Sequence, residues 1–275
     1  MSKAKVLFVS QQIEPYIEEG HLSHVSRYLP QSTQERGKEI RTFMPRYGCI
    51  NERRYQLHEV IRLSGMNQII DDSDHPLIIK VASIQAARMQ VYFIDNEEYF
   101  QRKTTFRDER GKFYKDNDER MIFFCRGVLE TVKKLGWAPD IIHCHGWMTS
   151  LLPYYLKKVY NDDPVFTNTR VVYSVYDEGF TESLDKRLAV KLEAGEDFAE
   201  QLKMLDDPTF DNLNNFAIEM ADGVIAGSEK INAEAEKAMK QTDKMILGYQ
   251  SLEKYADAYS DFYDELLESN PVLAS

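Results

Sequence analysis

The sequence predicts an α/β protein built on one doubly wound, mostly parallel sheet of the Rossmann-like type. Short continuous apolar runs, which suit strands buried on both faces, alternate with segments of helical periodicity. The first elements follow the order strand, loop, helix, strand, which is the signature of a βαβ unit. Hydrophobic residues make up 43% of the 275 residues, enough for a substantial core.

The N-terminal unit begins with residues 5–10, a short apolar run that predicts a buried strand. A loop with Pro15 and Gly20 follows. Leu22, Val25 and Leu29 then recur at helical spacing, and Gly37 ends that helix. Residues 39–45 predict the second strand.

The next segment predicts strands without helices between them. Residues 55–63, 77–83 and 89–95 are strand-like and closely spaced, with a polar turn at 71–74 between the first two. This spacing indicates a meander or hairpin insertion at the edge of the sheet.

The second half of the chain returns to alternation of helices and strands. The predicted elements are, in order, helix 118–135, strand 140–144, helix 147–160, strand 170–175, a helical segment 184–205 with a break near Gly195, helix 212–220, strand 223–227, helix 229–240 and helix 252–267. We find no internal repeat and no low-complexity linker. We therefore expect one domain over 1–245, and a C-terminal helix within 246–275 that packs back on it.

Charge and cysteine content limit the partners and the compartment. A net charge of −11 argues against nucleic acid or an anionic membrane as the main partner. The densest basic stretch, 101–115, is interleaved with acids and reads as a solvated loop. Three cysteines without CxxC spacing fit a reducing compartment. With no signal-peptide pattern and no apolar run near 18 residues, we expect a cytoplasmic protein.

In sheets of this kind, ligands bind at the carboxyl ends of the strands, where the strand order switches. The loops within residues 10–21, 45–50, 144–149 and 175–180 follow predicted strands. They are the candidate site.

Six segments together resemble the N-terminal lobe of bacterial glycogen synthase and plant-type starch synthase. Each is weak alone, but their order and spacing match that family. They are the opening strand and loop 6–22, Phe43-Met-Pro-Arg-Tyr-Gly48, the run 91–100, Asp116-Asn-Asp-Glu-Arg120 with Phe123-Phe124, Asp140-Ile-Ile-His-Cys-His-Gly-Trp147, and Met220-Ala-Asp-Gly-Val-Ile-Ala-Gly-Ser228.

The resemblance implies one lobe of a two-lobed B-type glycosyltransferase. That family transfers glucose from ADP-glucose to the non-reducing end of an α-1,4-glucan with retention, and its N-terminal lobe mostly binds the acceptor. The resemblance implies a candidate catalytic role for His145, and α-glucan or ADP-glucose as ligand. We expect no cofactor. The implied substrate-binding positions are Gly20, His21, Tyr47, Asn117, His145, Trp147 and Thr149.

The chain departs from the family pattern in three ways. After Ser228 the family continues for roughly a further lobe, whereas here about 30 residues lead to a helix that looks like the family's last one. The lysine of the family's Lys-x-Gly-Gly-Leu loop is Glu18, which replaces attraction to the donor phosphates by repulsion. At ~4 Å and an effective dielectric near 20 this reversal lowers donor affinity roughly a thousandfold. The family's aspartate is Gly146, and its Ile-His-Asn is 174–176 here.

Several readings stay open from the sequence. His145 either faces a sugar or caps the following helix, and Trp147 is a core anchor or a sugar platform. His21, His24, His143 and His145 could be drawn as a metal site, but their spacing is not diagnostic and we expect none.

Two functions are compatible with these residues. One is a glucosyltransferase of the glycogen synthase type, active by itself or with a separate C-terminal half. A protein partner on the inter-lobe face is also possible. The other is a non-catalytic pseudoenzyme that binds glucan or regulates. We favour the second, because one lobe leaves the reaction open to water.

Overall fold

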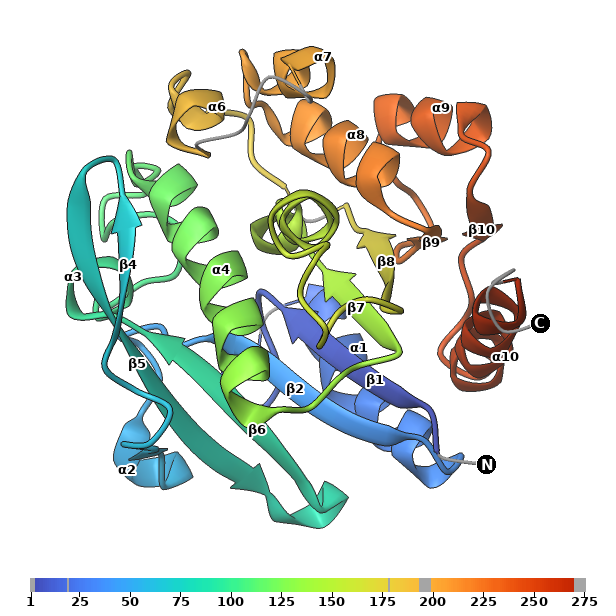
Figure 1. Cartoon of the computed structure of the whole chain (residues 1–275), viewed down its shortest axis with the longest axis horizontal. Helices are drawn as coiled ribbons and strands as arrows, with labels where there is room; N and C mark the ends of the chain where they lie inside the picture. The colour runs from blue at the N-terminus through green and yellow to red at the C-terminus, as the bar shows by residue number, and fades with distance from the viewer. Residues whose placement is uncertain (1–2, 19, 178, 193–198, 270–275) are drawn as a thin grey trace.

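The computed structural model describes residues 3–18, 20–177, 179–192 and 199–269, and it confirms the predicted fold class (Figure 1). A ten-stranded mixed sheet has the order β10-β9-β8-β7-β1-β2-β6-β5-β3, with β4 paired to β5. The strands are β1 (Lys5–Ser10), β2 (Glu39–Pro45), β3 (His58–Glu59), β4 (Met66–Ile70), β5 (Ser73–Ile84), β6 (Met89–Asp95), β7 (Ile141–His145), β8 (Arg170–Val175), β9 (Gly223–Ala226) and β10 (Met245–Leu247).

The strand order places a switch point between β1 and β7. From β1 the chain moves outward through β2 to β6, and it later returns to the other side of β1 as β7. Both neighbours of β1 are parallel to it, with Ser10 opposite His145 in the register. Strands β4, β5 and β6 form the antiparallel edge that the closely spaced runs predicted.

Helices cover both faces of the sheet. They are α1 (Gly20–Glu35), α2 (Glu52–Tyr55), η1 (Gln85–Ala87), α3 (Glu97–Phe100), α4 (Asn117–Leu135), η2 (Trp147–Thr149), α5 (Leu152–Tyr154), η3 (Tyr155–Val159), α6 (Leu188–Lys191), α7 (Ala199–Leu202), η5 (Lys203–Leu205), α8 (Phe210–Met220), α9 (Ala233–Gln241) and α10 (Tyr255–Glu268). No helix of the described residues is long and apolar enough to cross a membrane.

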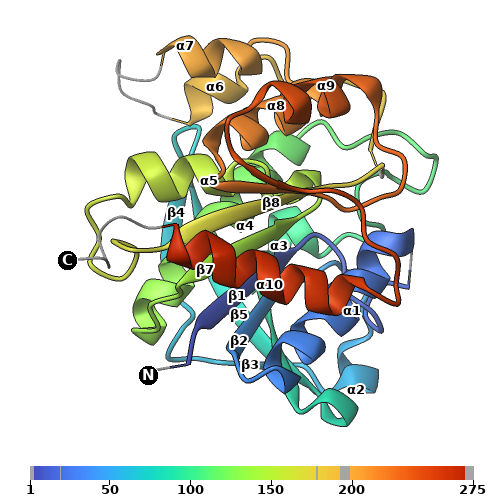
Figure 2. The ribbon, with the colours of Figure 1, turned by 90° about the vertical axis from the view of Figure 1, so that its right-hand side faces the viewer.

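Helix α10 lies beside α1 on one face of the sheet, as Figure 2 shows. Because side chains alternate along a strand, Val6 and Phe8 of β1 pack toward these two helices, whereas Leu7 and Val9 join the larger cluster with α4. The buried side of α10 comprises Tyr255, Tyr259, Phe262, Tyr263 and Leu266. Leu252, the first residue of the predicted helix 252–267, precedes α10 and is half exposed.

Two element predictions are wrong for local reasons. The strand expected over 55–63 is reduced to β3, because Asn51 caps the short helix α2 and Gln56 then takes a left-handed conformation at φ 55°. The helix expected over 147–160 is divided into η2, α5 and the π-helix η3. Pro153 lies at the start of α5, where a proline without N–H ends the preceding turn.

Further differences from expectation include two strands and the start of one helix. Strands β4 and β10 were not predicted. Helix α9 begins at Ala233 rather than 229, because the Asn232 side chain accepts a hydrogen bond from the Ala235 N–H. The break expected near Gly195 lies outside the described residues.

Candidate functional site

The candidate site lies at the carboxyl ends of β1, β7, β8 and β9, next to the switch between β1 and β7. On the face toward α10, these strand ends present His145 and Tyr176, and α1 places His21 against the ring of Tyr176 at 6.4 Å between centroids. The loop after β10 places Tyr249 6.2 Å from the ring of His21. His21, Tyr176 and Tyr249 therefore form a row above His145, which we call the aromatic row.

His145 lies beneath this row, with no exposed surface. Its Nδ1 is 2.8 Å from the Tyr176 hydroxyl, while its Nε2 has no hydrogen-bond partner among the described residues. Burial lowers the pKa of His145 to about 3, so the ring is neutral at pH 7. A buried nitrogen without a protein partner is unusual, and a water or a ligand hydroxyl would satisfy it.

Tyr249, at one end of the aromatic row, also lines a hollow of about 520 Å³. It is lined by Ala226, Ser228, Glu229, Lys230, Ile231, Glu236, Met239, Lys240, Ile246 and Tyr249. Two lysines are matched by two glutamates, and Lys240 pairs with Glu236 at 2.6 Å. Most of the surface that faces the hollow is nevertheless apolar. Such a surface suits the face of a sugar ring or another small neutral molecule.

Gly146 takes a backbone conformation with φ +85° and ψ 163°, which side chains rarely adopt. A Cβ at this position would lie 2.4 Å from Oε1 of Gln11. That oxygen accepts the Met148 N–H at 3.4 Å, and Thr149 donates to the Gly146 carbonyl at 2.7 Å. The Gln11 side chain thus fills the space beside Gly146.

Trp147 is buried in an aromatic cluster. Its ring lies 4.9 Å from Phe106 and 4.9 Å from Phe180, with Phe113 at 6.1 Å. This packing uses both the loop before α4 and the loop after β8. Trp147 therefore anchors the two loops, and only 3% of its surface is exposed.

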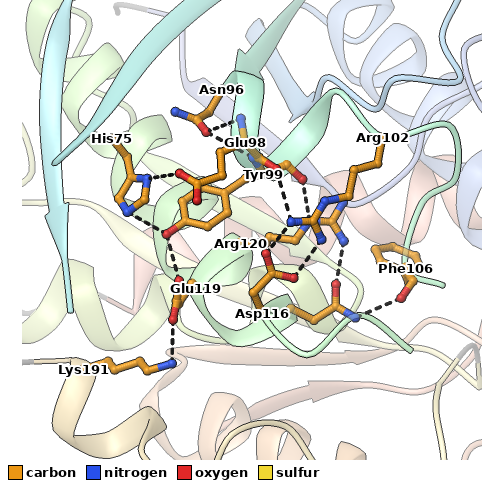
Figure 3. A network of polar contacts seen from close by, with 11 residues as sticks. His75, Asn96, Glu98, Tyr99, Arg102, Phe106, Asp116, Glu119, Arg120 and Lys191 are labelled. Carbon is orange, nitrogen blue, oxygen red and sulfur yellow. Dashed lines mark hydrogen bonds and ion pairs between the residues drawn. The ribbon is translucent and has the colours of Figure 1, made fainter. Parts of the chain in front are cut away.

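Tyr47 and Asn117 hold the backbone of neighbouring loops. The Tyr47 hydroxyl donates to the Gln11 carbonyl at 3.0 Å. The Asn117 amide donates to the Phe106 carbonyl at 3.0 Å, and this bond is drawn at Phe106 in Figure 3. Arg120, which is fully buried, donates to the side-chain oxygen Oδ1 of Asn117. Both predicted site residues are buried and have structural contacts.

A connected polar network extends from Arg120 and Asn117 to α6 (Figure 3). His75 Nε2 is 2.9 Å from the Tyr99 hydroxyl, which donates to Glu119 at 3.0 Å. Glu119 and the fully buried Asp118 each accept from Lys191 at 2.7 Å. The network ties α6 to the start of α4, away from the aromatic row.

Glu18 and Gly20 flank the entrance to α1. Glu18 is exposed, and Gly20 begins the helix with φ 74°, which glycine accommodates without strain. The carboxylate therefore projects into solvent. Among the described residues, no three His, Cys, Asp or Glu side chains form a group able to hold a metal ion.

The structure brings His21 and His145 together through Tyr176, but it places Tyr47, Asn117 and Trp147 in packing roles. Sequence reasoning missed Gln11, Tyr249 and the hollow. Tyr249 follows a strand end, and that signal would have found it had β10 been predicted.

Comparison with known proteins matches this fold and these motifs. The family model described as the starch synthase catalytic domain covers residues 5–246. A glycogen synthase from Chlorobium limicola is 42% identical over 173 residues, 62% of this chain and 35% of that protein. One from Chlorobaculum tepidum is 39% identical over 204 residues, 70% and 42% of the two chains.

A solved structure, the catalytic domain of starch synthase IV from Arabidopsis thaliana bound to ADP and acarbose, aligns with a TM-score of 0.68. The alignment covers 91% of this chain and 52% of that one at 21% identity, which supports the fold. The chain thus spans between a third and a half of the length of these two glycogen synthases.

Proposed function

The chain belongs to the starch synthase catalytic domain family, and from this premise we propose that it is a glucan-binding lobe of the glycogen synthase type that does not by itself transfer glucose from ADP-glucose. The observation that carries the proposal is the neutrality of the aromatic row. Burial lowers the pKa of His21, with the nearby His24 adding to the effect, and His145 beneath the row is neutral too. Neutral imidazole and phenol groups suit sugar hydroxyls.

A nucleotide diphosphate needs a different environment. Its leaving group requires cations or directed N–H groups where negative charge develops. The loop before α1 instead carries the exposed carboxylate of Glu18. Of the two ligands in the Arabidopsis structure, we therefore propose that this chain favours the oligosaccharide type over the nucleotide.

We propose that first contact with glucan is made by Tyr249 at the hollow, with the neighbouring ring of His21 beside it. His145 has no exposed surface, so its role is to support Tyr176 from beneath. We place the protein in the cytoplasm, because three cysteines without CxxC spacing fit a reducing compartment. Any protein partner would contact the same carboxyl edge.

Isothermal titration of the purified chain with maltoheptaose and with ADP-glucose, separately, tests this proposal. We expect heat of binding with maltoheptaose, and its loss in Tyr249→Ala. Tyr28→Ala removes an exposed tyrosine of α1 outside the row and serves as the matched control. Binding of ADP-glucose alone, or of neither ligand, would refute the proposal.

The competing function is glucosyl transfer by this chain. It predicts incorporation of labelled glucose into glycogen when the purified chain is incubated with ADP-glucose. We expect no incorporation above a heat-treated sample. Turnover that persists after repurification would show that the chain is an enzyme.

A further inference from the structure

The contact between α10 and the sheet includes a buried hydrogen bond to a histidine. Tyr263 has no exposed surface, and its hydroxyl lies 2.6 Å from Nδ1 of His143. The other ring nitrogen of His143, Nε2, is 2.7 Å from the Ser174 hydroxyl. Both nitrogens are therefore bonded, and the ring cannot turn over without breaking two hydrogen bonds.

The direction of these bonds follows from the available partners. Burial and the neighbouring His145 lower the pKa of His143, so one of its nitrogens donates and the other accepts. Among the described residues, the hydroxyl of Tyr263 has no acceptor other than His143. Tyr263 must therefore donate to Nδ1, since a buried phenol proton without an acceptor is costly. His143 then donates from Nε2 to Ser174, which hydrogen-bonds to Tyr259.

The fixed ring of His143 forms one wall around His145. The two imidazole rings are 3.9 Å apart between centroids, and Phe8 contacts both at 6.0 and 6.2 Å. His145 in turn hydrogen-bonds to Tyr176, the member of the aromatic row that lies next to His21. A continuous line of contacts thus runs from α10 to the row.

We propose that Tyr263 is a positioning residue: by fixing His143 it sets the ring orientation of His145, and through Tyr176 it holds the aromatic row in place for glucan. The inference about ligand rests on the proposed function, whereas the inference about ring orientation does not. Helix α10 lies beyond residues 5–246, which the family model matches.

The test is Tyr263→Phe in the full chain, which keeps the ring and removes only the hydroxyl. Tyr255→Phe is the matched control, because it removes a hydroxyl from the same buried side of α10, where Tyr255 bonds to Ser32. The readout is the ring ¹⁵N resonances of all histidines in the ligand-free protein. These report which nitrogen is protonated and whether each is hydrogen-bonded, and packing alone does not determine them.

We expect Tyr263→Phe to move the resonances of both His143 and His145, while Tyr255→Phe leaves them in place. Unchanged His145 resonances in a folded Tyr263→Phe protein would overturn the proposal. Should Tyr263→Phe fail to fold, Ser174→Ala breaks the other bond of His143 and must produce the same coupled movement of His145.

Maltoheptaose titration of the same variants then separates the two proposals. We expect Tyr263→Phe to weaken binding about fivefold, equivalent to about 1 kcal/mol of added cost for ordering the aromatic row, and Tyr255→Phe to leave it unchanged. Coupled resonances without maltoheptaose binding in the unaltered chain would refute the glucan proposal and leave the positioning role standing. Unaltered affinity in Tyr263→Phe would refute the link from α10 to the row.

Discussion

Replacing Lys191 with methionine should destabilise the fold by about 3 kcal/mol near neutral pH. Its ammonium is 3% exposed and contacts Asp118 and Glu119 at 2.7 Å and Asp185 at 3.1 Å. At 2.7 Å and an effective dielectric near 20, one such attraction is about 6 kcal/mol before desolvation is subtracted. Measured losses for a broken buried pair are about 3–5 kcal/mol, and the lower end applies because two of the carboxylates reach solvent.

The loss of stability in Lys191→Met should depend on pH, and the pKa of Asp118 determines whether the loss grows or shrinks as pH rises. Burial raises the pKa of Asp118 to about 6, above its unfolded value, and Lys191 opposes this rise. Without Lys191 the folded pKa rises further, so the folded state binds the proton more tightly. Stability of the variant therefore recovers as pH falls through that raised pKa, and the loss is larger at about pH 7.5 than at about pH 5.

Urea unfolding followed by circular dichroism at the two pH values measures both effects. Lys191→Met combined with Asp118→Asn should regain most of the stability, because the uncompensated buried charge is gone. Lys240→Met is the control, since Lys240 pairs with Glu236 in solvent and should change stability by less than about 0.5 kcal/mol. Equal losses at both pH values would refute the reasoning.

Three other substitutions test the edge of the sheet. Gly146→Ala should lower the free energy of unfolding by about 3 kcal/mol, because its backbone is left-handed and a Cβ would contact Gln11. Adding Gln11→Ala should recover only the loss due to that contact, and strictly additive losses in urea unfolding would contradict this. Tyr47→Phe should lower the free energy of unfolding by about 1–2 kcal/mol, because the buried Gln11 carbonyl loses its donor. Tyr28→Phe is the control, and equal melting temperatures of the two variants would contradict this prediction. Glu18→Lys should tighten ADP binding about fivefold in calorimetry, and Glu18→Gln should have a Kd between those of the unaltered chain and Glu18→Lys. Screening by solvent makes this effect smaller than the thousandfold expected from the sequence. An unchanged Kd in Glu18→Lys would show that Glu18 does not oppose ADP binding.

The strands that the sequence predicted well are those whose signal is continuous and buried. The bounds of β2, β6 and β8 agree with the predicted ranges, and each strand contains at least four consecutive buried residues. Residues 55–63 failed because a local cap at Asn51 outweighed their strand-like composition. A three-residue edge strand such as β10 is too short to give any periodic signal. The domain division at residue 245 stays a prediction.

The position of the site was more predictable than its contacts. Strand-end geometry places His145 at the switch point, and the register with Ser10 agrees with it. The sequence held no signal that Tyr176 would cover His145, or that Tyr263, 120 residues from His143, would bond to it. Such contacts depend on how separate elements pack, and spacing within one element does not encode them.

Two departures from the family pattern differ in how deeply they are built into the fold. Glu18 projects into solvent, so one substitution can reverse its charge without disturbing any packing. Gly146 is different, because the Gln11 side chain occupies the space beside it and accepts the Met148 N–H. An aspartate restored at residue 146 alone would collide with Gln11. Recovering a polar pocket there therefore requires changing both residues together, and Glu18→Lys alone cannot restore the family's site.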